Sequence, residues 1–356
     1  METILQTSVK MKTGILKDKR YLEHNMGDYH VETPERLKAI YSMIDEEITF
    51  PYYSILPRKA VEDEILAIHS RDYFEFIKNT SGKERIFLDP DTSTSARTFE
   101  TALLAAGGVL QAAEDIIASS IDNGFAFIRP PGHHAERSRA MGFCFFNNIA
   151  IAAHHLIKKH GIKRLLIADW DIHHGNGTQN SFYTRDDVLF FSTHQYPYYP
   201  GTGHWSETGE EKGKGYTINI PLSPGKTDED YGYIYEKILF PIASQFEPEF
   251  ILVSVGFDIY HQDPLGGMLV TKAGFSFMTS ILQKIAVKYA GGRILFILEG
   301  GYNLQGLKEG SKEILLHISG NREQVSLSTE ASEITKKELK PVIEIHKKFW
   351  DQLECI

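Results

Sequence analysis

Residues 164–176 read RLLIADWDIHHGN and combine a buried strand with a cluster of polar side chains. The run Arg164–Ala168 is apolar after its first residue and long enough for a strand that is covered on both faces. Asp169, Asp171 and His173 follow it directly. Ionisable side chains beside a buried strand are unfavourable unless they are paired or bind a metal. This stretch therefore predicts a parallel strand whose carboxyl end carries chemistry.

Similar apolar runs recur along the chain and alternate with helical patterns. Four more runs have the length and composition of buried strands: Phe125–Ile128, Val188–Phe191, Phe250–Val255 and Arg293–Leu298. Between them, apolar residues recur every three or four positions over Phe99–Ser119, Asn147–Lys159, Asp228–Phe246 and Lys272–Tyr289. Strands linked by such helices form right-handed crossovers, so we expect an α/β fold with a parallel sheet.

We expect a single domain over residues 1–356, with a core from about 14 to 318 and a helical tail from about 321 to 356. Within the core, the sequence Thr33-Pro34-Glu35-Arg36 predicts a helix start, because it offers a capping hydroxyl and a proline at the first helical position. The tail begins with Ser326–Glu333, which is typical of a loop. A helix that is interrupted or begun anew at Pro341 should follow.

The composition is that of a globular enzyme, with 42% hydrophobic and 24% charged residues. No apolar run approaches the ~18 residues of a membrane span, and the first residues lack the pattern of a secretion signal. The net charge of −9 without a basic cluster argues against nucleic-acid binding. We therefore expect a cytoplasmic protein that acts on neither membranes nor nucleic acids.

The two cysteines, Cys144 and Cys355, are not part of a CxxC pair, which argues against a disulfide framework and a thiolate zinc knuckle. Cys144 is expected to be a small core residue. Any metal must then be held by histidine and carboxylate groups.

Polar clusters follow four of the five predicted strands. They are Arg129-Pro-Pro-Gly-His133-His134, Asp169-Trp-Asp171-Ile-His173-His174, Gly256-Phe-Asp258 and Glu299-Gly-Gly-Tyr302-Asn303. The carboxyl ends of parallel strands meet at one crevice, so these side chains should share a pocket. One such pair alone would more often be turn or capping residues, but four clusters together favour a site.

Asp171 and His173 are two residues apart, which directs both side chains to one side of an extended segment. Asp258 from a neighbouring strand would complete a set of three ligands and leave a position open for water, as catalytic metals require. This donor set favours zinc, with iron(II) as the alternative.

The chain resembles the histone deacetylase and acetylpolyamine amidohydrolase family, particularly its class II-like members. The resemblance is carried, in order, by PPGHHA, GFCFFNNIAIAA, DWDIHHGNGTQ, FYTRDDVLFFSTHQYPYYPGTG, VSVGFD, DPLGGM and LEGGYN, and it covers nearly the whole chain. It implies the arginase–deacetylase fold, an eight-stranded parallel sheet flanked by helices. It also implies a zinc-dependent amidohydrolase that removes acetyl groups from lysine side chains or lysine-like amines.

The resemblance assigns roles to residues of the polar clusters. It implies zinc ligation by Asp171, His173 and Asp258, the tandem histidines His133 and His134 beside the activated water, and Tyr302 as the donor to the oxyanion. Asp169 would support His133, and Asn176 would orient His134; the neutral amide should raise a histidine pKa less than a carboxylate would. We favour His134 as the base and later the acid, with His133 mainly electrostatic, although the pair can titrate as a unit.

The resemblance also implies a substrate tunnel and potassium sites. Phe143 and Tyr199 would form the tunnel walls, the Gly142 carbonyl would accept the substrate amide N–H, and Leu265 would occupy the place of a glutamate that selects polyamines in one branch. Potassium would be bound mainly by main-chain oxygens: Asp169, Asp171, His173, Ser192 and Thr193 at one site, and Phe182, Arg185, Val188 and Tyr216 at another. Arg36 matches an arginine that lines an internal channel.

Three other functions compete with acyl-lysine hydrolysis. An acetylpolyamine deacetylase would use the same chemistry, but the apolar Leu265, at the place of the polyamine-selecting glutamate, favours an acyl-lysine substrate. An arginase-like ureohydrolase would need carboxylates where the chain has Gly175 and Tyr260. A non-catalytic acetyl-lysine-binding module would be signalled by loss of Tyr302 or of one ligand, and all are present. The remaining histidines are expected to be structural. His154, His155 and His160 lie on a predicted helix with no carboxylate partner at ligand spacing and should be packing or surface residues, and His174 should be buried and hydrogen-bonded.

Overall fold

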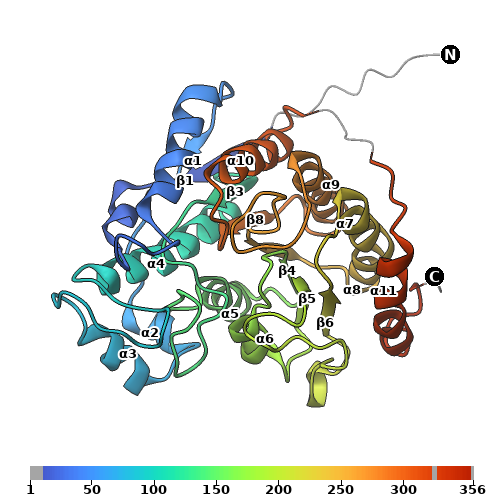
Figure 1. The fold of residues 1–356 in the computed structure, drawn as a ribbon, viewed down its shortest axis with the longest axis horizontal. Coiled ribbons are helices and arrows are strands. Elements are labelled where there is room, and N and C mark those ends of the chain that lie inside the picture. The colour runs from blue at the N-terminus through green and yellow to red at the C-terminus, as the bar shows by residue number, and fades with distance from the viewer. Residues whose placement is uncertain (1–10, 323–326, 354–356) are drawn as a thin grey trace.

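A single parallel sheet organises the chain in a computed structural model, which describes residues 11–322 and 327–353 (Figure 1). Its strands are β1 (Thr13–Leu16), β2 (Tyr53–Ser54), β3 (Asn123–Ala126), β4 (Leu165–Asp169), β5 (Val188–Gln195), β6 (Thr217–Leu222), β7 (Phe250–Val255) and β8 (Ile294–Leu298). The order across the sheet is β2-β1-β3-β8-β7-β4-β5-β6, and every neighbouring pair is parallel. The expected eight-stranded α/β fold is confirmed.

Helices cover the sheet and connect its strands. They are α1 (Pro34–Glu47), α2 (Glu62–Leu66), α3 (Arg71–Lys78), α4 (Thr98–Ile117), α5 (Asn148–His160), α6 (Asn176–Phe182), α7 (Asp228–Ile234), α8 (Phe240–Phe246), α9 (Lys272–Tyr289), α10 (Leu304–Ile318) and α11 (Glu333–His346). Short turns η1 (Lys19–Glu23), η2 (Glu211–Gly213) and η3 (Tyr235–Leu239) complete the description. Helices α4 and α5 pack on each other, as do α9 with α10 and α10 with α1 (Figure 1).

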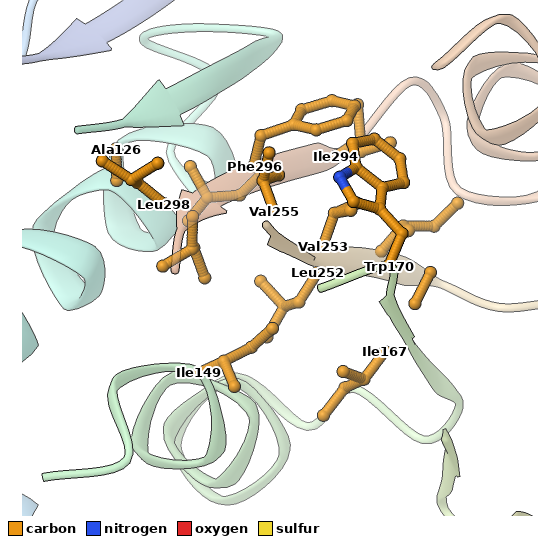
Figure 2. Close-up of a cluster of buried hydrophobic side chains, with 14 of the residues drawn as sticks. Ala126, Ile149, Ile167, Trp170, Leu252, Val253, Val255, Ile294, Phe296 and Leu298 are labelled. Atoms are coloured by element: carbon orange, nitrogen blue, oxygen red, sulfur yellow. The ribbon is translucent and has the colours of Figure 1, made fainter. Parts of the chain in front are cut away.

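Strands β4, β7 and β8 are largely apolar because both of their faces are buried. Trp170, at the end of β4, is fully buried and lies beside Phe296 of β8, with ring centroids 6.1 Å apart. Figure 2 shows this contact together with Ile149 of α5 and Ile167 of β4, which belong to the same apolar core. The packed core holds the strand ends, and the loops after them, in fixed positions.

Two helix predictions require correction. The segment Asp228–Phe246 is not one α-helix, since the π turn η3 separates α7 from α8. Pro241, which lacks an N–H, follows this turn. The prediction of a break at Pro341 is wrong, because α11 runs through it. The helix persists since Leu339, Val342 and Ile343 are buried against the rest of the molecule.

The start of α1 at Pro34, after Thr33, is as predicted, although the Thr33 side chain makes no capping hydrogen bond. Residues 327–332 have no regular structure, in agreement with the predicted loop, whose first residue, Ser326, lies outside the described residues.

Candidate active site

Three predicted metal ligands converge beyond the carboxyl ends of β4 and β7, which are neighbouring strands. The Nδ1 atom of His173 lies 3.0 Å from Oδ1 of Asp171 and 3.3 Å from Oδ2 of Asp258. One candidate ligand atom from each residue lies within 4.8 Å of the other two. Strand register thus brings residues that are distant in sequence around one point.

The surroundings of the two carboxylates fit a bound cation. Oδ1 of Asp258 accepts a hydrogen bond from the Ile172 N–H, whereas its buried Oδ2 makes no hydrogen bond within the described part of the chain. Oδ2 of Asp171 accepts from the Gly300 N–H at 2.8 Å. A Cβ atom at Gly300 would lie 2.3 Å from Asp258 Oδ2, so only glycine allows this approach. Two nearby buried carboxylates with a free oxygen are favourable when a cation neutralises them.

The pKa values of Asp258 and His173 in the metal-free protein also indicate that this cluster of carboxylates favours a bound positive charge. Burial, together with the charge of Asp171, raises the pKa of Asp258 to about 7. Burial disfavours the imidazolium of His173, yet the neighbouring carboxylates of Asp171 and Asp258 raise its pKa to about 9. A bound cation would take the place of that proton between the carboxylates.

The tandem histidines lie beside this point, with ring centroids 4.0 Å apart. Nδ1 of His133 is 2.9 Å from Oδ2 of Asp169, and Nδ1 of His134 is 2.8 Å from Oδ1 of Asn176. Burial disfavours a charge on either ring, yet the carboxylates of Asp169 and Asp171 raise the pKa of His133 to about 10. Burial and the neighbouring charge of His133 lower the pKa of His134 well below its ordinary value. The two shifts have opposite directions, so His133 holds a proton more readily than His134 does.

A cavity of about 380 Å³ opens over these groups. Its lining includes the predicted residues Gly142, Phe143, Tyr199, Leu265 and Tyr302, together with His133, His134, Asp171 and His173. It also includes residues to which the sequence analysis assigned no role: Tyr29, His30, Val31, Asp91, Pro131, Tyr198 and Gly300. The predicted tunnel residues and ligands thus share one cavity.

The tunnel walls are aromatic and held in place. Phe143 contacts Tyr302 edge to face, with centroids 6.1 Å apart, and Tyr199 contacts His134 in the same way at 5.2 Å. Phe143 has a φ of 67°, an uncommon conformation for a non-glycine residue and typical of functional sites. The Gly142 carbonyl accepts a bond from the buried Cys144 thiol at 3.2 Å. Cys144 is the core residue that we expected, and Cys355 lies outside the described residues.

Three carboxylates orient the site in ways that were not predicted, although Glu299 was part of an expected polar cluster. Oδ2 of Asp263 accepts the backbone N–H groups of Tyr302 and Asn303 at 2.6 and 3.0 Å. Glu299 accepts the N–H groups of Gly132 and His133. Glu32 is fully buried and pairs with Arg36 and Arg129. In the sequence, Asp263 and Glu299 lie within the DPLGGM and LEGGYN segments, and Glu32 directly precedes the predicted helix start at Thr33.

A model of the histone deacetylase domain matches residues 30–318. The chain belongs to the histone deacetylase family. It is 42% identical over 299 residues to a probable deacetylase of Archaeoglobus fulgidus, covering 83% of both chains. It is 36% identical to histone deacetylase 15 of Arabidopsis thaliana over 98% of this chain and 64% of that one, and 36% identical to histone deacetylase HDA1 of Candida albicans over 96% and 45%. The chain thus spans only part of the two longer relatives.

The crystal structure of the HDA15 HD domain superposes with a TM-score of 0.91 at 37% identity, covering 96% of this chain and 98% of that one. Fold and family together identify a histone deacetylase family protein, and the activity that the family supports is hydrolysis of an amide bond. Within residues 11–322 and 327–353, no helix is both long and apolar enough to cross a bilayer.

The predicted potassium positions of this histone deacetylase homologue lie near the ends of β4, β5 and β6. Thr193 Oγ1 is 3.5 Å from the Asp169 carbonyl oxygen. The Phe182 and Tyr216 carbonyl groups accept backbone bonds from Arg185 and Phe190, both at 2.9 Å. Ser192 and Val188 lie in β5. These sites stay predictions.

Two of the three histidines on the predicted helix have a carboxylate partner that is not at ligand spacing in the sequence. His155 and His160 do have a carboxylate partner, Glu114, which is 2.7 and 3.0 Å from their Nε2 atoms. Glu114 comes from α4, so sequence spacing could not reveal it. Although these three residues could hold a metal, the ammonium group of Lys159 lies 2.6 Å from Glu114 and already neutralises it. His174 is buried and bonded to Thr202 and Gln179, in agreement with its structural role.

The second-metal positions of the ureohydrolase alternative lack carboxylates. Gly175 caps α6, and the Tyr260 hydroxyl donates to Glu309 at 3.2 Å. The geometry brings together ligands for one ion.

Proposed function

We propose that this chain is a zinc-dependent deacetylase that hydrolyses the acyl amide of a lysine side chain or a lysine-like amine. The observation that carries the proposal is the placement of Asp171, His173 and Asp258 around one point, beside a neutral His134 and within one cavity. Family membership supports the deacetylase activity.

Zinc held by the three ligands would act as a Lewis acid on the acyl carbonyl and lower the pKa of a water molecule toward about 7. Iron(II) is the alternative ion for the same donor set.

The two histidines then have different tasks. His134, neutral and with Nδ1 bonded to Asn176, can accept a proton at Nε2 from the attacking water and later deliver it to the leaving amine. His133, cationic beside Asp169, stabilises negative charge that develops in the transition state. Tyr302 donates its hydroxyl hydrogen to the same developing oxyanion.

The tunnel supplies binding and orientation. Phe143 and Tyr199 enclose the methylene chain of the substrate amine, and apolar walls exclude water from the reacting bond. The Gly142 carbonyl accepts the substrate amide N–H with its second lone pair. Potassium at the predicted main-chain sites would support the loops that hold the ligands.

An acetylpolyamine is the second candidate substrate, and one observation favours it. Asp91 lines the cavity, and a carboxylate there would attract a second ammonium group. Leu265, apolar and in the same cavity, favours an acyl-lysine instead.

The test compares an acetyl-lysine peptide with N-acetylputrescine and N-acetylspermidine, using zinc-loaded wild type and Asp258→Ala. We expect turnover of the peptide by the wild type and a loss of both zinc and turnover in the variant. Failure of the zinc-loaded protein to hydrolyse any acyl amide would overturn the deacetylase proposal. Faster polyamine turnover would overturn the role given to Leu265.

A further inference from the structure

The Asn176 side chain lies between the His134 ring and the carboxylate of Glu136. Its Oδ1 is 2.8 Å from His134 Nδ1, and its Nδ2 is 2.8 Å from Glu136 Oε1. Three groups thus form a relay from the tandem histidines to the edge of the site.

The relay fixes which way the amide faces. A carboxylate only accepts hydrogen bonds, so the NH₂ group of Asn176 must point toward Glu136. Two further acceptors surround the same nitrogen, the His134 carbonyl oxygen at 3.5 Å and the Met141 sulfur at 3.4 Å. The reverse orientation would place the amide oxygen 2.8 Å from Glu136 Oε1, with no proton between two acceptors.

The fixed amide in turn selects the form of the histidine. Because Oδ1 faces His134 and can only accept, the proton of the neutral ring must be on Nδ1. The lone pair is then on Nε2, the atom that accepts the proton in hydrolysis.

We propose that Glu136 is a positioning residue that sets the tautomer of His134 through Asn176, and this inference rests on the function proposed above. The backbone of Glu136 is held in place, because its N–H donates to the Arg139 carbonyl oxygen at 3.0 Å. The same Oε1 atom that accepts from Asn176 also accepts from Asn180 Nδ2 at 3.0 Å.

The relay also explains why the adjacent rings of His133 and His134 favour different charge states. His133 contacts the Asp169 carboxylate directly, and a direct negative charge favours its cationic form. His134 meets a neutral amide, with the carboxylate one group further away. The carboxylate therefore orients His134 without placing a full charge against it.

The decisive variant is Glu136→Lys, because lysine is a donor only and should reverse the amide of Asn176. The tautomer is read from the ¹⁵N chemical shifts of His134 in the full-length, zinc-loaded protein, with the signal assigned by its loss in His134→Gln. We expect Nδ1–H in wild type and Nε2–H in Glu136→Lys. The matched control is Asn180→Ala, which keeps the Asn176–Glu136 bond and should retain Nδ1–H. An unchanged Nδ1–H in a folded Glu136→Lys protein would overturn the proposal.

A second arm does not depend on the folding of the lysine variant. Glu136→Gln can present either an acceptor or a donor, so kcat should fall by about tenfold or more at unchanged KM. In an Asn176→Asp background, where both oxygens of residue 176 accept, the same substitution should not lower kcat. Equal losses in the two backgrounds would refute the relay. An inactive wild type would refute the proposed function, while the tautomer measurement would still decide the role of Glu136.

Discussion

The guanidinium group of Arg36 lies over the ring of Tyr302, with its Cζ atom 5.1 Å from the ring centroid. Its Nε and Nη2 atoms donate to the carbonyl oxygens of Gly301 and Glu299, both at 2.6 Å. A buried charge thus holds both the ring and the backbone that precedes it. Arg36 is not among the residues that line the cavity, so it acts on the position of Tyr302 through the ring and the preceding backbone.

Replacing Tyr302 by phenylalanine should remove the oxyanion donor and leave the ring packing intact. We expect kcat to fall by about 10²–10³ with little change in KM or zinc content, because the bond is made mainly in the transition state. Steady-state kinetics on an acetyl-lysine peptide checks this. Tyr260→Phe is the matched control and should retain full activity, since its hydroxyl faces Glu309. A parallel rise in KM would show that the hydroxyl binds the ground state instead.

The buried carboxylate of Glu32 should be essential for stability. It pairs with Arg36 at 3.0 Å and also with Arg129, and all three side chains are buried. Glu32→Gln would leave two buried guanidinium groups without a counter-charge, which should lower the free energy of unfolding by about 3–5 kcal/mol. Denaturant titration measures this change.

The control is Glu35→Gln in the first turn of α1, which breaks an exposed pair with Lys38. It should change the free energy of unfolding by about 0–1 kcal/mol. Similar effects of the two substitutions would contradict a structural role for the Glu32 cluster.

The sequence predicted the fold and the centre of the site for the same physical reason. Strands such as β7 and β8 are buried on both faces and read as apolar runs, and the carboxyl ends of parallel strands meet. The strands β1, β2 and β6 were not predicted individually: β1 and β2 are very short, and β6 contains Asn219 and Pro221.

The supporting residues were missed because their partners are distant in sequence. Asp263 lies 39 residues from Tyr302, Glu136 lies 40 from Asn176, and Glu32 lies 97 from Arg129. No local pattern encodes such pairs. For Pro341 the local rule was misleading, because burial of one face of α11 outweighs the lost backbone hydrogen bond.

Zinc should stabilise the wild-type protein against unfolding, because the ion replaces a proton between Asp171 and Asp258. At a free zinc concentration of 100 Kd the gain should be about 2.7 kcal/mol. Asp258→Asn should abolish this gain, since the oxygen without a hydrogen bond is lost or neutralised. Thermal unfolding with and without a chelator measures the effect.

The matched control for zinc is Asp187→Asn, which removes a carboxylate paired with Arg185 on the molecular surface. It should retain the zinc-dependent stabilisation. Stabilisation of Asp258→Asn to the wild-type extent would place the ion elsewhere.

His346 should make the protein less stable in acid. It is fully buried in α11, neither ring nitrogen makes a hydrogen bond among the described residues, and burial lowers its pKa to about 4. Between pH 6.5 and 4 the unfolded chain binds a proton there and the folded chain does not, so stability falls as the pH falls through this window. The loss of stability should be about 2 kcal/mol at pH 5.

Denaturant unfolding of wild type and His346→Leu at pH 7 and pH 5 checks this prediction. Between pH 7 and pH 5 the free energy of unfolding should fall less in His346→Leu than in wild type. In the control His261→Leu, at an exposed position, it should change as in wild type. If the gap between His346→Leu and wild type is the same at both pH values, His346 is protonated in the folded state or has access to water.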